Sequence, residues 1–200
     1  RFSEPREVRP QERESLRLTP SDESRSDTPT ALAQVGLRYI VAMIGKELLF
    51  IDQHRAAERV LLEKLRAVER PAKQFLTLPQ TLELTPSQAA AVAEHSELLA
   101  DMGFDVERFG PRGWLLRAVP AGLEYGAPEQ ALVELLDELA EWQAPASQEA
   151  RAEQARAMVA CHAAIKAGQR LSKEQMQRLV EDLLATSSPA VCPHGDPIIL

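Results

Sequence analysis

Residues 37–65 read LRYIVAMIGKELLFIDQHRAAERVLLEKL, and this stretch changes from strand-like to helix-like at one aspartate. Two apolar runs of strand length, LRYIVAMI and ELLFI, flank a Gly45-Lys46 turn and predict a β-hairpin. Asp52 follows the second run directly. Its carboxylate can accept a backbone N–H of the next turn, so we expect Asp52 to cap a helix that continues to about Arg70. A hairpin that leads into a helix favours the α+β class.

The middle of the chain predicts a second compact unit, of strand, helix and hairpin, over residues 79–127. Thr85 and Gln88 form a capping box, with a proline at the first helical position, for a helix that ends before Gly103. The runs FDVERF and WLLRAV then flank a turn at residues 111–113 and predict another hairpin. This unit has the form of an inserted subdomain.

Three further helices are expected in the last third of the chain. Their apolar periodicity and end signals place them at residues 128–142, at 147–167 and from Ser172 to about Ala185. Ser172 and Gln175 supply a capping box for the last of them. The tail that follows reads as a loop and an extended end.

Composition limits the class of protein. Residues 1–30 are rich in Arg, Glu, Ser and Pro, have almost no large apolar residue, and predict a disordered linker. The chain starts at Arg1, so we expect a piece of a longer protein. No apolar run approaches the roughly 20 residues of a membrane span, and no signal-peptide pattern is present, which favours an intracellular protein without a membrane partner. The net charge of −7 argues against a large cationic surface for nucleic acid.

Any contact with DNA must therefore be local. One local group of cations follows the predicted hairpin, although solvated helix charges are its simpler interpretation: Arg55, Arg59, Lys64, Arg66, Arg70 and Lys73.

Candidate metal ligands occur in three separate segments. His54 and Glu58 are one helical turn apart and share a face. Cys192 and His194 alternate in CPHGDP, and in an extended backbone both side chains point the same way. Cys161 lies in an apolar helix, where a cysteine is more often a small buried residue than a ligand. Thiols, imidazoles and carboxylates together suit Zn²⁺ or Mn²⁺.

Two alternatives apply to these residues. The two cysteines could form a single disulfide, although an intracellular protein normally keeps them reduced. His95 has only Glu94 and Glu97 nearby in sequence, and we interpret it as a surface residue.

The three segments resemble the motifs of the C-terminal domain of the MutL family of DNA mismatch repair proteins, in the form that carries a latent endonuclease. The family pattern DQHA, two residues, E, four residues, E is matched by DQHRAAERVLLE. Its ACK segment resembles ACHAAIKAG, and its CPHGRP segment resembles CPHGDP. Order and spacing agree from about residue 31 to the end. Arg55, His162 and Asp196 depart from the Ala, Lys and Arg of the pattern, and no aromatic-x-Arg end follows CPHGDPIIL.

The resemblance implies functional residues. The catalytic residues would be Asp52, His54, Glu58 and, in the outer shell, Glu63. The metal ligands would be His54, Glu58, Cys161, Cys192 and His194.

A fourth segment, QFLTLP, resembles the Q-x-L-x-x-P peptide by which bacterial proteins bind the replicative sliding clamp. Gln74, Leu76 and Pro79 would be its clamp-binding residues, and an ordinary loop before a strand is the alternative.

The resemblance also implies organisation and partners. Residues 31–78 and 146–200 would form a dimerisation and endonuclease subdomain, and residues 79–145 an inserted regulatory subdomain. The protein would be a cytoplasmic, nucleoid-associated bacterial homodimer that binds DNA, the sliding clamp and the mismatch recognition protein MutS. It would nick DNA with bound Zn²⁺ and activating Mn²⁺, and ATP would be used only by an upstream domain absent from this fragment.

A homodimer is also expected from the residues themselves, because the first hairpin carries apolar side chains on both faces. The alternative function is a dimerisation and partner-binding module with a structural or regulatory zinc site and no nuclease activity. A zinc-stapled domain without a role on DNA is a second alternative, but it leaves QFLTLP unexplained.

Overall fold

The computed structural model describes residues 28–110, 113–123, 127–145 and 147–200. Most of the predicted linker, residues 1–27, and the Pro111-Arg112 turn lie outside this part of the chain. The strands are β1 (Thr30–Val35), β2 (Tyr39–Ile44), β3 (Glu47–Asp52), β4 (Lys73–Glu83), β5 (Asp105–Phe109) and β6 (Gly113–Pro120). The helices are α1 (Gln53–Arg66), α2 (Pro86–Glu94), α3 (Ser96–Asp101), α4 (Pro128–Ala140), α5 (Gln148–Ala163) and α6 (Lys173–Leu184).

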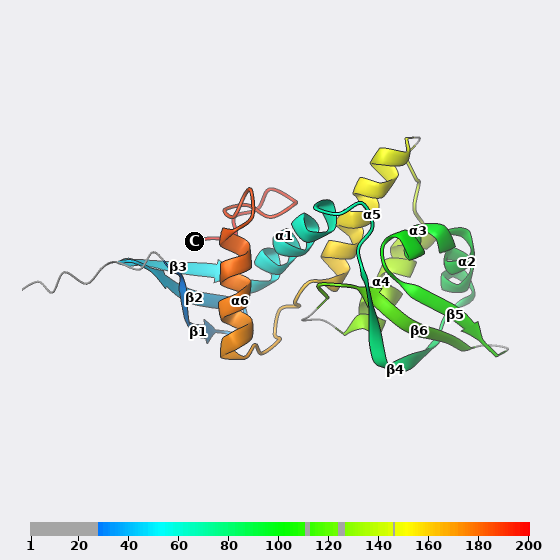
Figure 1. Ribbon diagram of the computed structural model, residues 1–200, viewed down its shortest axis with the longest axis horizontal. Helices are drawn as coiled ribbons and strands as arrows, with labels where there is room; N and C mark the ends of the chain where they lie inside the picture. The colour runs from blue at the N-terminus through cyan, green and yellow to red at the C-terminus, as the bar shows by residue number, and fades with distance from the viewer. Residues whose placement is uncertain (1–27, 111–112, 124–126, 146) are drawn as a thin grey trace, which may run out of the picture.

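Two antiparallel sheets and their flanking helices confirm the α+β class. The first sheet has the strand order β1-β2-β3, and the second has the order β4-β6-β5. Figure 1 shows the sheets at opposite ends of the molecule, with α1 and α5 between them. Among the described residues, no helix combines the length and apolar character that crossing a membrane requires.

The first hairpin is confirmed, and a third strand joins it. Strands β2 and β3 pair from Tyr39↔Asp52 to Ile44↔Glu47, on either side of Gly45, which has a φ of +57°. Strand β1 pairs with β2 and was not predicted, because TALAQV has neither a long apolar run nor regular alternation. Leu37, the expected start of the first strand, instead lies in the β1–β2 turn with a φ of +52°.

The expected helices form, but three have different limits. Helix α1 ends at Arg66 instead of about Arg70, and the predicted helix after Thr85 divides at His95 into α2 and α3. Helix α5 ends at Ala163, because Ala164 has an extended backbone with a ψ of 158°. The chain then turns toward the first sheet, where Ile165 is fully buried.

Strand β4 contains the whole QFLTLP segment and runs across the predicted boundary at residue 79. The strand pairs with β6 from Lys73 to Phe75 and again from Gln80 to Glu83. The register shifts between these two sections, and the four residues in between make no ladder pairs. A bulge is where a strand tolerates proline, since proline cannot donate to the ladder.

Two apolar clusters form the core, and α1 belongs to both. Ala56 and Val60 pack with the first sheet and α6, whereas Leu62 and Leu65 pack with α4, α5 and the second sheet. The first turns of α1 therefore lie against the first sheet, and this is where the sequence places the candidate ligands.

The first sheet has a buried inner face and an apolar outer face. Ile40 and Ile51 are fully buried against the helices. On the outer face, which we define by Met43, Leu48 and Phe50, Leu48 is 52% exposed and Phe50 is 41% exposed. Contiguous exposed apolar surface of this kind is typical of a protein interface.

Candidate metal centre and its pocket

The residues predicted as metal ligands line one open pocket at the start of α1. We call it the ligand pocket, and its lining residues are Arg38, Asp52, His54, Arg55, Glu58, Cys161, Ala167, Cys192, His194 and Asp196. Three separate segments thus meet at one place, and the first of them precedes the other two by more than 100 residues.

Asp52 is the last residue of β3 and caps α1, as predicted. Its Oδ1 accepts hydrogen bonds from the backbone N of His54 at 3.1 Å and of Arg55 at 3.2 Å. Its Oδ2 is 3.3 Å from Nε of Arg38. Both oxygens of this buried carboxylate therefore have partners, and they set the direction in which α1 leaves the sheet.

His54 is oriented by a carbonyl that the sequence did not indicate. Its Nδ1 lies 2.7 Å from the backbone oxygen of Ile165, in the segment that follows α5. Because a carbonyl oxygen can only accept, a neutral imidazole carries its proton on Nδ1, and Nε2 keeps a free lone pair. That Nε2 faces Oε1 of Glu58 at 3.5 Å. A hydrogen bond on the far nitrogen is the usual support of a metal-binding histidine.

A buried glutamine holds the segment that follows Ile165. Gln53 is fully buried, and its Nε2 donates to the carbonyl oxygens of Leu37 at 3.0 Å and Gln169 at 3.1 Å. Its Oε1 accepts from Nε2 of Gln34 at 2.6 Å. Sequence reasoning missed this role, and the only signal was a glutamine between two residues of the DQH motif.

The CPHGDP segment brings a thiol and an imidazole to Glu58. Nδ1 of His194 is 3.8 Å from Oε2 of Glu58 and 4.0 Å from Sγ of Cys192. The backbone is a tight turn, closed by Gly195 N to Cys192 O at 3.0 Å, and not the extended segment that we predicted. Gly195 adopts a φ of +88°, which favours glycine. Arg59 secures the turn to α1 by donating to the carbonyl of Val191 at 2.8 Å.

Cys161 on α5 also faces Glu58. Burial and the neighbouring Glu58 carboxylate, to which the thiol is hydrogen-bonded, raise the pKa of Cys161 to about 11. The free protein therefore holds a neutral thiol here at physiological pH. A divalent cation favours the thiolate, so metal binding at this position would release a proton.

The pocket suits a transition metal. Ligand atoms of Glu58, Cys192 and His194 all lie within 4.8 Å of one another, and Glu58 is only 3% exposed. Bonds of about 2.0–2.3 Å to a tetrahedral Zn²⁺ place two ligands roughly 3.3–3.8 Å apart. The observed spacings of 3.5, 3.8 and 4.0 Å are close to that requirement.

Glu63 lies outside the ligand pocket. Its carboxylate accepts from Ser187, through Oγ at 2.5 Å and the backbone N at 3.2 Å. The Ser187 hydroxyl, followed by the Ser187 amide and the guanidinium groups of Arg59 and Arg66, lowers the pKa of Glu63 despite partial burial. The structure thus gives this residue a contact with the loop after α6.

We expect Glu63→Gln to lower the free energy of unfolding by about 1 kcal/mol near neutral pH, because it removes a charge-assisted hydrogen bond to Ser187. A lowered pKa contributes stability above the unfolded value of 4.5, and that contribution is lost as the pH falls through the folded pKa. The difference between wild type and variant should therefore disappear in acid. Urea unfolding at several pH values measures it, with the exposed Glu94→Gln as control. A pH-independent difference would contradict this assignment.

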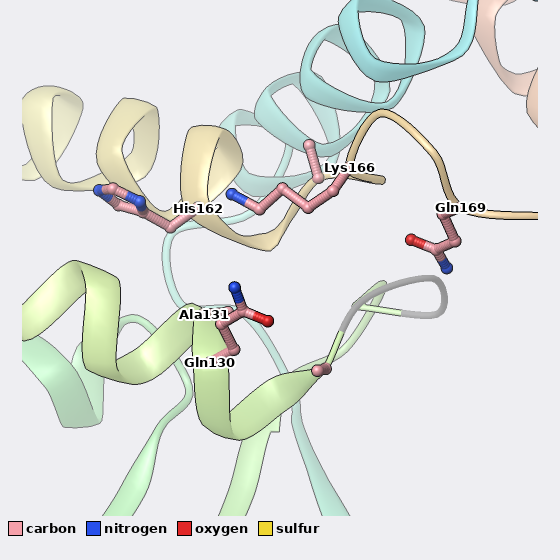
Figure 2. Close-up of a pocket in the computed structure, with 7 residues that line it drawn as sticks. Gln130, Ala131, His162, Lys166 and Gln169 are labelled. Carbon is pink, nitrogen blue, oxygen red and sulfur yellow. The ribbon is translucent and has the colours of Figure 1, made fainter. Parts of the chain in front are cut away.

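His162, which replaces the lysine of the family pattern, points away from the ligand pocket. Figure 2 shows His162 and Lys166 above α4, lining a second pocket with Gln130. His162 Nε2 is 2.6 Å from Oε2 of Glu138, and Lys166 Nζ is 2.9 Å from Oε2 of Glu134. The Lys166 ammonium is the main cause of a lowered Glu134 pKa. This departure therefore affects the contact between α4 and α5.

The fold and the pocket define an α+β module with a mixed sulfur, nitrogen and oxygen ligand set and an exposed apolar sheet. Residues 32–171 match the family model of the MutL C terminal dimerisation domain. The match includes His54, Glu58 and Cys161 and ends before Cys192 and His194.

Curated relatives extend the similarity. The chain is 40% identical over 182 residues to a DNA mismatch repair protein MutL of Koribacter versatilis, covering 88% of this chain and 28% of that protein. It is 37% identical to a DNA mismatch repair protein MutL of Rhizorhabdus wittichii, covering 84% of this chain and 29% of that protein. It is 38% identical to one of Acidobacterium capsulatum, covering 84% of this chain and 26% of that protein. The chain belongs to the MutL C-terminal dimerisation domain family of DNA mismatch repair. It spans a little over a quarter of the length of these relatives.

Proposed function

We propose that this chain forms a homodimer and nicks DNA at a divalent metal centre in the ligand pocket, as part of mismatch repair. One observation carries the proposal: His54, Glu58, Cys161, Cys192 and His194 converge from three segments on one open pocket. The names of the relatives supply the repair context and make DNA the substrate.

The residues of the pocket have separate roles in this proposal. Glu58, His54, Cys161, Cys192 and His194 would hold the cation, with zinc as the bound metal and manganese as the activating one. When bound, the cation supplies Lewis acidity toward a phosphodiester and lowers the pKa of an attacking water.

Other residues prepare this arrangement. Asp52 sets the start of α1, and the Ile165 carbonyl keeps the lone pair of His54 Nε2 directed at the pocket. The open side leaves room for substrate, as a catalytic metal site requires. ATP would be bound only by a part of the protein outside this chain.

The second candidate function is a dimerisation and partner-binding module with a structural or regulatory zinc and no nuclease activity. The ligand set favours it in one respect, since two cysteine thiols are typical of structural zinc. The pocket favours the enzyme in another, because it is open and also lined by Asp52 and two arginines.

A nicking assay separates the two functions. Purified protein should carry zinc by mass spectrometry and should convert supercoiled plasmid to open circles when Mn²⁺ is added. Nicking without a bound metal would contradict the proposed centre. Zinc without nicking, at any Mn²⁺ concentration, would favour the second function.

The partners follow from the same proposal. We place the protein in the bacterial cytoplasm at the nucleoid, with MutS and the sliding clamp as partners. The clamp peptide would be Gln74, Leu76 and Pro79 of β4, with Leu76 and Pro79 in its bulged part. An exposed peptide can fill separate pockets of a partner with alternate side chains. Phe75 is 69% exposed and Leu78 is 79% exposed, whereas Leu76 packs partly against the core.

We expect Gln74→Ala with Leu76→Ala to weaken binding to a bacterial sliding clamp by at least about tenfold, since two anchors are truncated together. Surface plasmon resonance with immobilised clamp measures the change. Gln74→Ala alone separates lost recognition from lost packing at Leu76, and Phe109→Ala on β5 is a control that truncates an exposed apolar side chain on the same sheet. Unchanged affinity of the double variant would make QFLTLP an ordinary strand.

A further inference from the structure

Arg55 links the two segments that carry the metal ligands. It lies in the first turn of α1, beside His54, and its Nη1 donates to the carbonyl of Pro197 at 2.8 Å. Its Nη2 is 3.4 Å from Oδ2 of Asp196. Arg55 and Asp196, which stand where the family pattern has Ala and Arg, therefore form an ion pair at the edge of the ligand pocket.

The ligand pocket has an excess of acids, so an incoming DNA phosphate needs a cation. Asp52, Glu58 and Asp196 line it, and Arg38 and Arg55 are its two cations. Arg38 is bound to the buried Asp52 and also lies over the ring of Tyr39.

Cations farther along α1 are bound to other acids. Arg59 pairs with Glu63, Lys64 with Asp182, and Arg66 with Glu153.

We propose that Arg55 binds a DNA phosphate beside the metal centre, and that the Asp196 carboxylate occupies the same donors until DNA displaces it. This inference rests on the proposed action on DNA. A carboxylate and a phosphate both present paired oxygens to a guanidinium, so either can be the partner of Arg55.

The geometry allows a DNA phosphate to replace the Asp196 carboxylate at little cost in free energy. The side chain of Asp196 is 57% exposed and that of Arg55 is 28% exposed, and an ion pair in contact with water contributes little to stability. The Asp196 backbone oxygen accepts from Cys192 N at 2.8 Å, so the turn stays closed when the side chain swings away. The bond to Pro197 keeps the guanidinium in place meanwhile.

DNA affinity without added Mn²⁺ tests the proposal. Binding of a short fluorescein-labelled duplex, followed by anisotropy at several salt concentrations, should weaken in Arg55→Gln. Its slope of log affinity against log salt should fall by about one, as for a lost phosphate contact. A merely structural anchor would not change that slope. Asp196→Asn should bind about fivefold more tightly, because it frees the Arg55 donors.

Matched variants separate this effect from general charge. Arg117 and Glu107 form an exposed ion pair on the second sheet, outside the ligand pocket. Arg117→Gln and Glu107→Gln should therefore change DNA affinity less than Arg55→Gln and Asp196→Asn do. When Arg55 is already replaced by Gln, Asp196→Asn should raise DNA affinity no more than Glu107→Gln does in the wild-type protein.

Three results would overturn the proposal. The first is an undiminished gain in DNA affinity from Asp196→Asn when Arg55 is already replaced by Gln. The second is an unchanged salt slope in Arg55→Gln, and the third is absence of DNA binding by both wild type and Asp196→Asn at low salt. Zinc content, measured in parallel, should stay constant in all variants. Nicking is not used in this test, so a failure of nuclease activity alone would leave this result intact.

Discussion

Glu58→Gln is expected to reduce metal-dependent nicking by at least about a hundredfold, since even partners that only support a metal ligand contribute 10–100-fold. Glu58 is buried, and its two oxygens face His54 and His194. The amide has the same shape but lacks the charge, so it would hold a cation poorly while the helix remains folded. Nicking of supercoiled plasmid in excess Mn²⁺ measures the loss, and bound zinc should fall with it.

Three comparisons test whether the lost nicking in Glu58→Gln comes from the missing charge in the ligand pocket. Glu63→Gln makes the same change on the same helix outside the ligand pocket, and we expect it to lower nicking activity at most a few-fold. Asp52→Asn should abolish nicking although asparagine still caps the helix, because it removes a negative charge from the lining of the ligand pocket. In Glu58→Gln the Cys161 thiol should also react faster with an alkylating reagent, because the neighbouring carboxylate helps to raise its pKa. If wild type and Glu58→Gln nick equally, the pocket is not the catalytic centre.

Phe50→Asp is expected to convert a dimer into a monomer at micromolar concentrations. Phe50, Leu48 and Met43 form the apolar outer face of the first sheet, and a two-fold axis would place this face against its own copy. A carboxylate buried in that contact without a partner would cost several kcal/mol, or roughly a thousandfold in the dissociation constant. Sedimentation equilibrium measures the change.

The control for this prediction uses the other sheet. Phe109 on β5 is 60% exposed, and Phe109→Asp should leave the dimer unchanged. A wild-type protein that is a monomer at these concentrations would contradict the proposed interface. A dimer that survives Phe50→Asp would place the interface elsewhere.

The features that the sequence predicted correctly depend on neighbours within a few residues. Asp52 caps α1, and the capping boxes at Thr85 and Ser172 both form. His54 and Glu58 face each other because a helix brings residues four apart to one side. The β2–β3 hairpin follows from its turn and its apolar runs. Such interactions can be read from a short window of sequence, because the local backbone alone decides them.

The features that the sequence did not predict depend on contacts between segments far apart in the chain. Strand β1 forms although its sequence is weak, because β2 pairs with it and Gln177 of α6 accepts from Ala31 N at 2.8 Å. Glu63 fits the family spacing, yet it faces Ser187, because five helical residues turn it away from Glu58.

The same holds for the metal centre. Residue types and local spacing named its candidate ligands. Packing of α5 and the C-terminal turn against α1 decided that these ligands meet, that Ile165 orients His54, and that Arg55 pairs with Asp196. A contact between residues more than 100 positions apart leaves no periodic pattern in the sequence, because the whole core, and not the local backbone, sets its geometry.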